Sequence, residues 1–139
     1  MSAVKRNIYE RLALKERVNM MKKARDLDLL VEELEAAQNL MQQIREAIDS
    51  EDATDRAVTA MQLRSDNWFR EKIMEQRAMV ENRCTFLDSE VQTARMKLSE
   101  ARHRHRKASD KALARRRAEA IEKEQKREDN QPKRKFVAH

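Results

Sequence analysis

The amino-acid sequence predicts an all-α protein, an antiparallel two-helix coiled-coil hairpin whose second helix is longer than the first. Composition is the first reason, because the strong helix formers Ala, Glu, Lys, Arg, Leu, Met and Gln dominate it. The second is the scarcity of turn residues, since the 139 residues include no Gly and one Pro. The third is the heptad spacing of the apolar residues, which argues against the disorder that a charged fraction of 40% could indicate.

The first helix is predicted over about residues 3–49. Its central part has apolar residues alternately three and four apart, as in the a and d positions of a coiled coil: Leu27, Leu30, Leu34, Ala37, Met41, Ile44 and Ile48. Upstream, a further group prolongs the stripe with a slip in its spacing: Val4, Ile8, Leu12, Leu14, Val18 and Met21. Such a slip is typical of a stutter, which relaxes the supercoil locally.

A polar segment, residues 49–55, follows the first stripe, and its Ser50 and Thr54 are candidate N-caps. We therefore expect a turn at 50–54 and a second helix over about 55–128. Two seven-residue series predict the buried face of this helix: Ile73, Val80, Leu87, Ala94, Ala101 and Ala108, and Cys84, Val91, Leu98, His105 and Ala112. Residues 1–128 would form one helical hairpin, followed by a disordered basic tail at 129–139.

A short connection favours antiparallel packing of the two helices. With the turn centred near residue 52, Leu34 would face the region of Arg70, and Met20 that of Cys84. Both helices rise ~1.5 Å per residue, so their difference in length can be counted in residues. The second helix would then extend beyond the first by roughly 25 to 35 residues. The alternative is a parallel dimer of long helices with a kink at residues 49–55.

Charge is distributed unevenly along the chain. Residues 101–135 hold fourteen Lys/Arg against six Asp/Glu, whereas residues 1–100 hold seventeen against nineteen. The predicted overhang is therefore basic, which suggests an acidic or ring-shaped partner. The clusters at 115–117 and 133–135 also permit nucleic-acid binding, but intervening acidic residues and the lack of aromatic residues for base stacking disfavour it.

No residue pattern indicates catalysis, a cofactor or a metal. A phosphate-binding loop requires Gly, and a two-helix hairpin is expected to have no pocket for catalytic carboxylates. His103 and His105 are two positions apart and would point to different helix faces, so joint metal ligation is not expected. Cys84 falls on the predicted buried face, where it would act as a small hydrophobic residue.

Two adjacent aromatic residues, Trp68 and Phe69, stand out in a chain with 4% aromatic residues. Because neighbouring helix positions differ by ~100°, we expect at least one of them to be exposed and available as an anchor for a protein partner. The N-terminal segment lacks the apolar core of a signal peptide, and no apolar run reaches the ~18 residues of a membrane span. We therefore expect a cytoplasmic protein.

Two stretches, IYERLALKERV and SDNWFREKIMEQRAMVENR, resemble the FliJ family of flagellar type III export stalks, which is akin to the YscO-type proteins of injectisomes. The second stretch has the Trp followed by an apolar-striped helix. The resemblance implies a monomeric, non-enzymatic central stalk that enters a hexameric export ATPase ring and promotes its assembly. It also implies contacts with the export gate membrane protein and with export chaperones, at the cytoplasmic face of the inner membrane, in flagellum biogenesis and chemotaxis.

The resemblance further implies which residues bind partners. The export gate would contact Trp68, Phe69 and Ile73, although Arg77 interrupts the apolar stripe there. The ATPase ring would contact basic residues of the second helix: Arg102, Arg104, Arg106, Arg115 and Arg116. Two alternatives remain open, a generic homodimeric coiled-coil scaffold and a basic nucleic-acid-associated helical protein.

Overall fold

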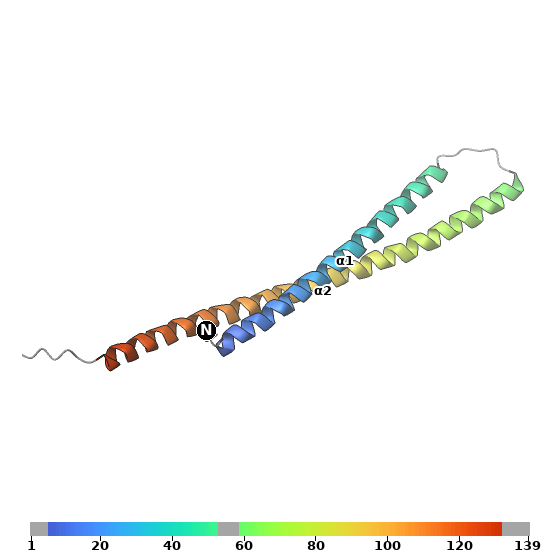
Figure 1. Cartoon of the computed structure of the whole chain (residues 1–139). Helices are drawn as coiled ribbons and strands as arrows, with labels where there is room; N and C mark the ends of the chain where they lie inside the picture. The colour runs from blue at the N-terminus through green and yellow to red at the C-terminus, as the bar shows by residue number, and fades with distance from the viewer. Residues whose placement is uncertain (1–5, 53–58, 132–139) are drawn as a thin grey trace, which may run out of the picture. The chain divides into compact units, whose positions relative to one another are not determined.

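The computed structural model describes residues 6–52 and 59–131, which form two α-helices, α1 at Ile8–Asp52 and α2 at Ala60–Asn130. The helices pack against each other as an antiparallel hairpin, and α2 is the longer (Figure 1). The predicted fold class is therefore confirmed. The chain divides into two compact units. The terminal unit comprises residues 1–22 and 99–139, and the central unit comprises residues 23–98. Each unit pairs a segment of α1 with a segment of α2.

Side-chain caps define where both helices begin. The Asn7 side-chain oxygen accepts a hydrogen bond of 2.8 Å from the backbone N–H of Glu10, at the start of α1. Thr59 and Gln62 form a reciprocal capping box at the start of α2. The Thr59 hydroxyl accepts from the Gln62 N–H at 3.3 Å, and the Gln62 side chain accepts from the Thr59 N–H at 3.2 Å.

The helix bounds differ from the predicted ones. Residues 50–52, expected in the turn, are the last residues of α1, and Ser50 lies inside this helix. Thr54 lies outside the described residues, and the cap of α2 is Thr59, a residue that the sequence analysis did not select. At the other end of α2, residues 129–130, expected in the tail, are helical, whereas residues 132–139 lie outside the described residues.

The core of the central unit follows the predicted heptad spacing. On α1, Ala37 and Met41 are buried, and on α2 both seven-residue series contribute buried or half-buried side chains. Leu87 and Val91 are the largest completely buried side chains among the described residues, with exposures of 1% and 2%. Arg77 is half-buried on the same seam. The central unit is therefore held by interdigitated aliphatic side chains.

On α2, the seam of the terminal unit is made mostly of small residues. Ala101, Ala108 and Ala112 of α2 are buried there. On α1 the three-and-four spacing of the central unit continues without a slip in four half-buried residues: Tyr9, Ala13, Glu16 and Met20. One carboxylate oxygen of Glu16 is buried without a hydrogen-bond partner. Glu16 therefore lies in the seam because its position in the three-and-four series faces the alanines of α2, although burying its charge is unfavourable.

The predicted apolar stripe at the start of α1 is consequently wrong as a core. Its described members are exposed, with relative exposures between 40% and 75%: Ile8, Leu12, Leu14, Val18 and Met21. The predicted stutter would rotate the buried face of α1 away from α2. Because the seven-residue series of α2 continues unbroken to Ala112, α1 keeps its phase and has no stutter. The pairing of the helices thus overrides the local apolar pattern, and a set of large apolar side chains remains on the surface.

The predicted register of the hairpin is also wrong. In the terminal unit, the Asn7 side chain donates to the Ala112 carbonyl at 3.5 Å, and Glu10 pairs with Arg116. In the central unit, Glu33 pairs with Arg83 at 3.8 Å, whereas residue 34 was expected near Arg70. The physical reason is that residues 60–72 of α2 are all exposed, so pairing begins well after the start of α2.

The corrected register shortens the predicted overhang. The basic residues from 101 to 116 pack beside the first turns of α1, instead of extending beyond it. Helix α2 continues past this region through residues 117–130, most of which are exposed. The overhang therefore corresponds to the last helical turns of α2 only.

We predict that Leu87→Ala lowers the free energy of unfolding by about 2–4 kcal/mol, because it removes a completely buried side chain and leaves a cavity. Phe86→Ala is the matched control, because Phe86 is adjacent in sequence but 61% exposed, and its loss is expected to change stability by less than about 0.5 kcal/mol. Urea unfolding followed by circular dichroism measures both values. Equal losses for the two variants would contradict the seam described here.

Candidate functional site

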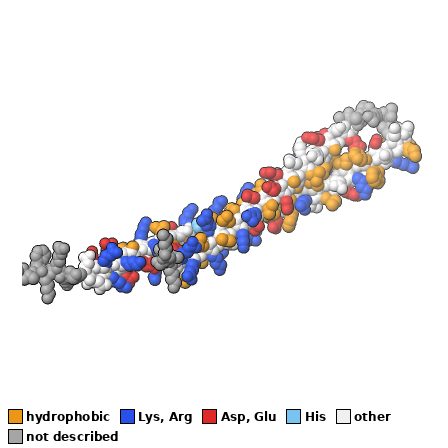
Figure 2. All heavy atoms as spheres, viewed as in Figure 1, with side chains coloured by type: hydrophobic (Ala, Val, Ile, Leu, Met, Phe, Trp, Pro, Cys, Tyr) orange, Lys and Arg blue, Asp and Glu red, His pale blue; other side chains and the backbone are white. Residues whose placement is uncertain are grey.

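The first candidate surface is an aromatic and methionine-rich face of α2 in the central unit. Trp68 is 61% exposed and Phe69 is 50% exposed, so both aromatic side chains are on the surface. Counting heptads from the buried seam places four large exposed side chains on the opposite side of α2: Met61, Trp68, Met79 and Phe86. We call these four residues the aromatic–methionine face. Phe69 and Met74 flank it, and Figure 2 shows apolar side chains on the surface near the start of α2.

The side chains of this face suit a protein interface. Exposed apolar clusters on a helix are typical of interaction sites, tryptophan is a frequent anchor residue, and methionine adapts to differently shaped partners. The Lys72 ammonium lies 5.9 Å from the centre of the Trp68 ring and 3.4 Å from a Glu75 carboxylate oxygen. These two contacts connect the indole to charged neighbours on its own helix and favour one orientation of the ring.

The three residues assigned to gate binding by resemblance do not share one surface. Trp68 and Phe69 are exposed, but Ile73 is half-buried and belongs to the seam. Other large apolar side chains exposed further along this side of α2 are Met79 and Phe86, which were not among the predicted site residues. Their spacing of seven from each other, on the side opposite the seam, is the signal that could have identified them.

The second candidate surface is the basic part of the terminal unit. Residues 6–22 and 99–117 together hold thirteen Lys/Arg against four Asp/Glu. The end of α2, residues 118–131, holds three against five, and the described part of the central unit holds ten against fifteen. Figure 2 shows Lys and Arg side chains gathered over the paired segments of the terminal unit. The prediction of a basic overhang is therefore corrected: the basic segment is paired with α1, and the helical overhang has more acidic than basic residues.

The arginines predicted to contact an ATPase ring lie in this basic part but differ in their surroundings. The side chains of four are exposed: Arg102, Arg104, Arg106 and Arg115. Arg115 pairs with Glu119 on its own helix at 3.3 Å. Arg116 is half-buried and donates two hydrogen bonds to Glu10 of α1, one of them 3.1 Å long from Nη2. Arg116 therefore connects the two helices of the terminal unit.

The ion pair between Glu10 and Arg116 changes how Glu10 titrates. The hydrogen bond from Arg116 is the largest influence on the Glu10 carboxyl and lowers its pKa from the ordinary value of 4.5. Burial opposes this effect on the pKa, and the charge of the guanidinium adds to the lowering. Because the pair is partly exposed, water and salt screen it. Its contribution to stability is consequently modest, and it serves mainly to fix the register of α1 on α2.

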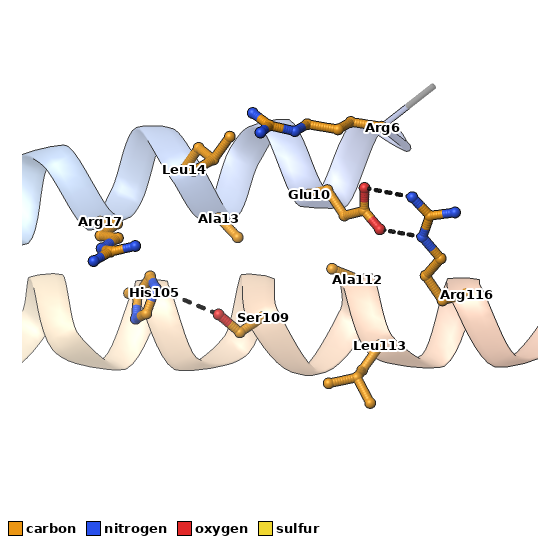
Figure 3. Close-up of a pocket in the computed structure, with 10 residues that line it drawn as sticks. All are labelled: Arg6, Glu10, Ala13, Leu14, Arg17, His105, Ser109, Ala112, Leu113 and Arg116. Atoms are coloured by element: carbon orange, nitrogen blue, oxygen red, sulfur yellow. Dashed lines mark hydrogen bonds and ion pairs between the residues drawn. The ribbon is translucent and has the colours of Figure 1, made fainter. Parts of the chain in front are cut away.

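A groove lies between the two helices next to this ion pair (Figure 3). Its volume is about 390 Å³, and both helices contribute to its lining. Ala13, Ser109 and Ala112 are the small residues of this lining, and Leu14 and Leu113 flank them (Figure 3). The expectation that a two-helix hairpin has no pocket is thus wrong for the terminal unit. Small seam residues leave this space because they do not fill the gap between the helices.

Of the candidate metal ligands, His105 lines the groove, whereas His103 is not among the lining residues. His103 is exposed, and His105 is half-buried with its Nε2 atom 3.5 Å from the Ser109 hydroxyl. Within residues 6–52 and 59–131, no group of three His, Cys, Asp or Glu side chains is arranged to hold a metal ion. Cys84 is half-buried on the seam. The helices of the described segments also lack any stretch that is long and apolar enough to cross a membrane.

The ion pair predicts a specific dependence of stability on pH. Because the pKa of Glu10 is lower in the folded chain, its contribution is present above about pH 4.5 and is lost as pH falls through the lowered pKa. We expect Glu10→Gln to have a lower melting temperature than the parent at pH 7, and we expect this difference to shrink on acidification. Melting followed by circular dichroism from pH 7 to pH 2 measures it.

The control for this prediction is the same substitution in an Arg116→Ala background, where the partner is absent. There Glu10→Gln should have little effect at any pH, because the double-mutant cycle removes the pairwise interaction. A pH-dependent difference of the same size in both backgrounds would contradict the pairing.

Trp68 is the single tryptophan of the chain, so its fluorescence reports directly on the aromatic–methionine face. We predict that acrylamide quenches it nearly as fast in the folded chain as in urea, because the indole is mostly exposed. Trp68→Ala should change the free energy of unfolding by less than about 0.5 kcal/mol. Ile73→Ala, at the half-buried seam, should cost more than Trp68→Ala. Strong protection of the indole would show that this face is covered in solution.

Comparison of the chain with protein-family models, with curated proteins and with solved structures finds no match. What the protein does must therefore be inferred from its own surfaces. Those surfaces are the aromatic–methionine face of the central unit, the basic part of the terminal unit and the groove between the terminal helices. All three have the chemistry of protein–protein contacts, with exposed apolar anchors and clustered charge.

Proposed function

We propose that the chain is a non-enzymatic, protein-binding helical hairpin that serves as the central stalk of a type III protein export ATPase complex. The observation that carries this proposal is the terminal unit, in which both terminal helical segments are paired and hold thirteen Lys/Arg against four Asp/Glu. A stalk of this kind has to insert paired helices into the lumen of a hexameric ring. The resemblance of the sequence to FliJ supports the same role.

The packing of the terminal unit suits insertion into a ring. The α2 side of its seam consists largely of alanines, namely Ala101, Ala108 and Ala112, whose small side chains leave space beside the seam for side chains of a partner. Clustered positive charge speeds association with an acidic surface and orients the encounter. The exposed Arg102, Arg104 and Arg106 would make the first contacts with the ring.

The aromatic–methionine face supplies a second surface for other partners. Under this proposal it binds the export gate membrane protein, with Trp68 and Phe69 as anchors, and export chaperones compete for neighbouring surface. Membrane association would then occur through partners, at the cytoplasmic face of the inner membrane. The chain would act as a monomer, because each unit pairs its own α1 and α2 segments.

Two alternatives predict different behaviour. A homodimeric scaffold made from a parallel dimer of long helices is disfavoured by the contacts that pair α1 with α2 in one chain, such as Glu10 with Arg116. A nucleic-acid-associated protein would use the same thirteen basic residues and would bind DNA or RNA with a steep dependence on salt. Retention on nucleic acid at physiological salt would favour this alternative.

The proposal predicts that the purified chain, which should not hydrolyse ATP alone, stimulates a hexamer-forming export ATPase and promotes ring assembly. The triple substitution of Arg102, Arg104 and Arg106 by Glu should reduce this stimulation at least five-fold, about 1 kcal/mol in the free energy of association, because it reverses three exposed charges of the segment that would enter the ring. Steady-state ATP hydrolysis and light scattering measure the two effects.

The matched control is the triple substitution of Lys123, Lys126 and Arg127 by Glu, which makes the same change of net charge in the helical overhang and should retain stimulation. Trp68→Ala combined with Phe69→Ala should also retain it, but should weaken binding to the export gate protein. An obligate dimer by light scattering, or no effect on the ATPase, would refute the stalk proposal.

A further inference from the structure

The groove of the terminal unit exposes an apolar lining that α1 and α2 do not cover themselves. Leu14 of α1 is 40% exposed and Leu113 of α2 is 53% exposed, and both line the groove with the small side chains of Ala13 and Ala112. In Figure 3, Ala13 and Ala112 lie between the helices, whereas Leu14 and Leu113 lie on the outer sides. The space has the form of a shallow trough with apolar walls.

Heptad spacing extends this trough along both helices. On α1, Met21 follows Leu14 by seven residues and is exposed on the same side of the helix. On α2, Arg106 precedes Leu113 by seven residues and is also exposed. Two antiparallel helices with apolar residues beside their seam present the surface on which a third helix packs in a bundle.

The charges around the trough determine which helix can pack there. Arg6, Arg17 and Arg116 line it together with a single acidic side chain, Glu10, which is already paired with Arg116. The paired segments around the trough increase this positive charge, since they hold thirteen Lys/Arg against four Asp/Glu. A basic helix would be repelled from this surface, whereas a helix with acidic flanks would be attracted to it.

We infer that this groove binds an acidic amphipathic α-helix of a protein partner. Its Leu, Met or Phe side chains pack between Leu14 and Leu113 above the alanines, and its Asp and Glu side chains face Arg6 and Arg17. The resulting contact is a local three-helix bundle. This inference does not depend on the proposed function, because it concerns one groove and any partner with such a helix.

A helix fits the groove better than the other anionic partners. A bilayer surface binds a convex apolar face bordered by basic residues, whereas the lining here lies between two helices. Nucleic acid has no aliphatic side chains to fill an alanine-lined space, and the half-buried imidazole of His105 is the one aromatic ring in the lining that could stack on a base. Only a partner with both apolar and acidic groups matches the complete lining.

The experiment uses the full chain and a fluorescent synthetic peptide of about 18 residues, five helical turns, with Leu along one face and Glu elsewhere. Fluorescence anisotropy should show one-to-one binding that weakens as salt is raised. Leu14→Ser combined with Leu113→Ser should weaken binding at least ten-fold. The matched control is Leu12→Ser, because Leu12 is 41% exposed but lies on the other flank of α1, and it should weaken binding less than two-fold.

A second pair of variants tests the charges separately from the apolar walls. Arg6→Glu with Arg17→Glu should weaken binding more than Arg11→Glu with Lys15→Glu, which makes the same change of net charge outside the groove. The four substituted side chains lie on the surface, so their replacement should not unfold the chain. Thermal melting followed by circular dichroism should confirm that each variant folds. This pair keeps the test decisive if the leucine variant unfolds.

Four results would overturn the inference. The first is no binding of the peptide, and the second is equal binding of a scrambled peptide whose Leu residues do not share a face. The third is binding of phosphatidylserine vesicles or duplex DNA, but not of the peptide, that depends on Leu14 and Leu113. The fourth is a concentration-dependent dimer that is lost in the leucine variant, which would assign the groove to a second copy of the chain.

Discussion

The unbroken seven-residue spacing of the α2 seam is the constraint on which the rest of the structure depends. From Ile73 to Ala112 the buried positions of α2 never change phase, so α1 has to present positions of matching phase to it. In the central unit these positions are aliphatic, and the sequence pattern agrees with the packing. In the terminal unit they include Glu16, and the large apolar residues of α1 are displaced to the surface. One geometrical requirement thus determines both the core and the exposed apolar residues.

The candidate surfaces are consequences of this constraint. The seam uses only one stripe of each helix, so every large apolar residue outside that stripe must be exposed. On α2 this produces the aromatic–methionine face, and on α1 it produces Leu14 and Met21 beside the groove. The same alanines that bring the terminal helices together leave space between them. Binding surfaces and packing defects therefore have a common origin in the choice of seam residues.

The sequence was sufficient to predict the fold class and the α2 seam, because the heptad repeat of α2 is regular and few other solutions bury it. The sequence was insufficient to predict the register, that is, the alignment of α1 along α2. Two heptad patterns still match when one helix is shifted by seven or fourteen residues, and only pairs such as Glu33–Arg83 distinguish these alignments. At the start of α1, hydrophobicity does not indicate burial, because the spacing of the residues decides which side chains face α2. Met79 and Phe86 were missed because hydrophobicity alone does not separate exposed apolar residues from buried ones, and only their position opposite the seven-residue seam distinguishes them.

The alanine seam of the terminal unit also bears on the order in which the hairpin forms. Alanines bury less apolar area than Leu87 and Val91, and Glu16 adds an unsatisfied oxygen, so each turn of the terminal pairing is weaker than a turn of the central one. The contact between Asn7 and Ala112 also joins residues 105 positions apart in the chain, and closing so long a loop costs entropy before any contact repays it. We therefore expect the central helical segments to pair first, and the terminal segments to pair last and fray first.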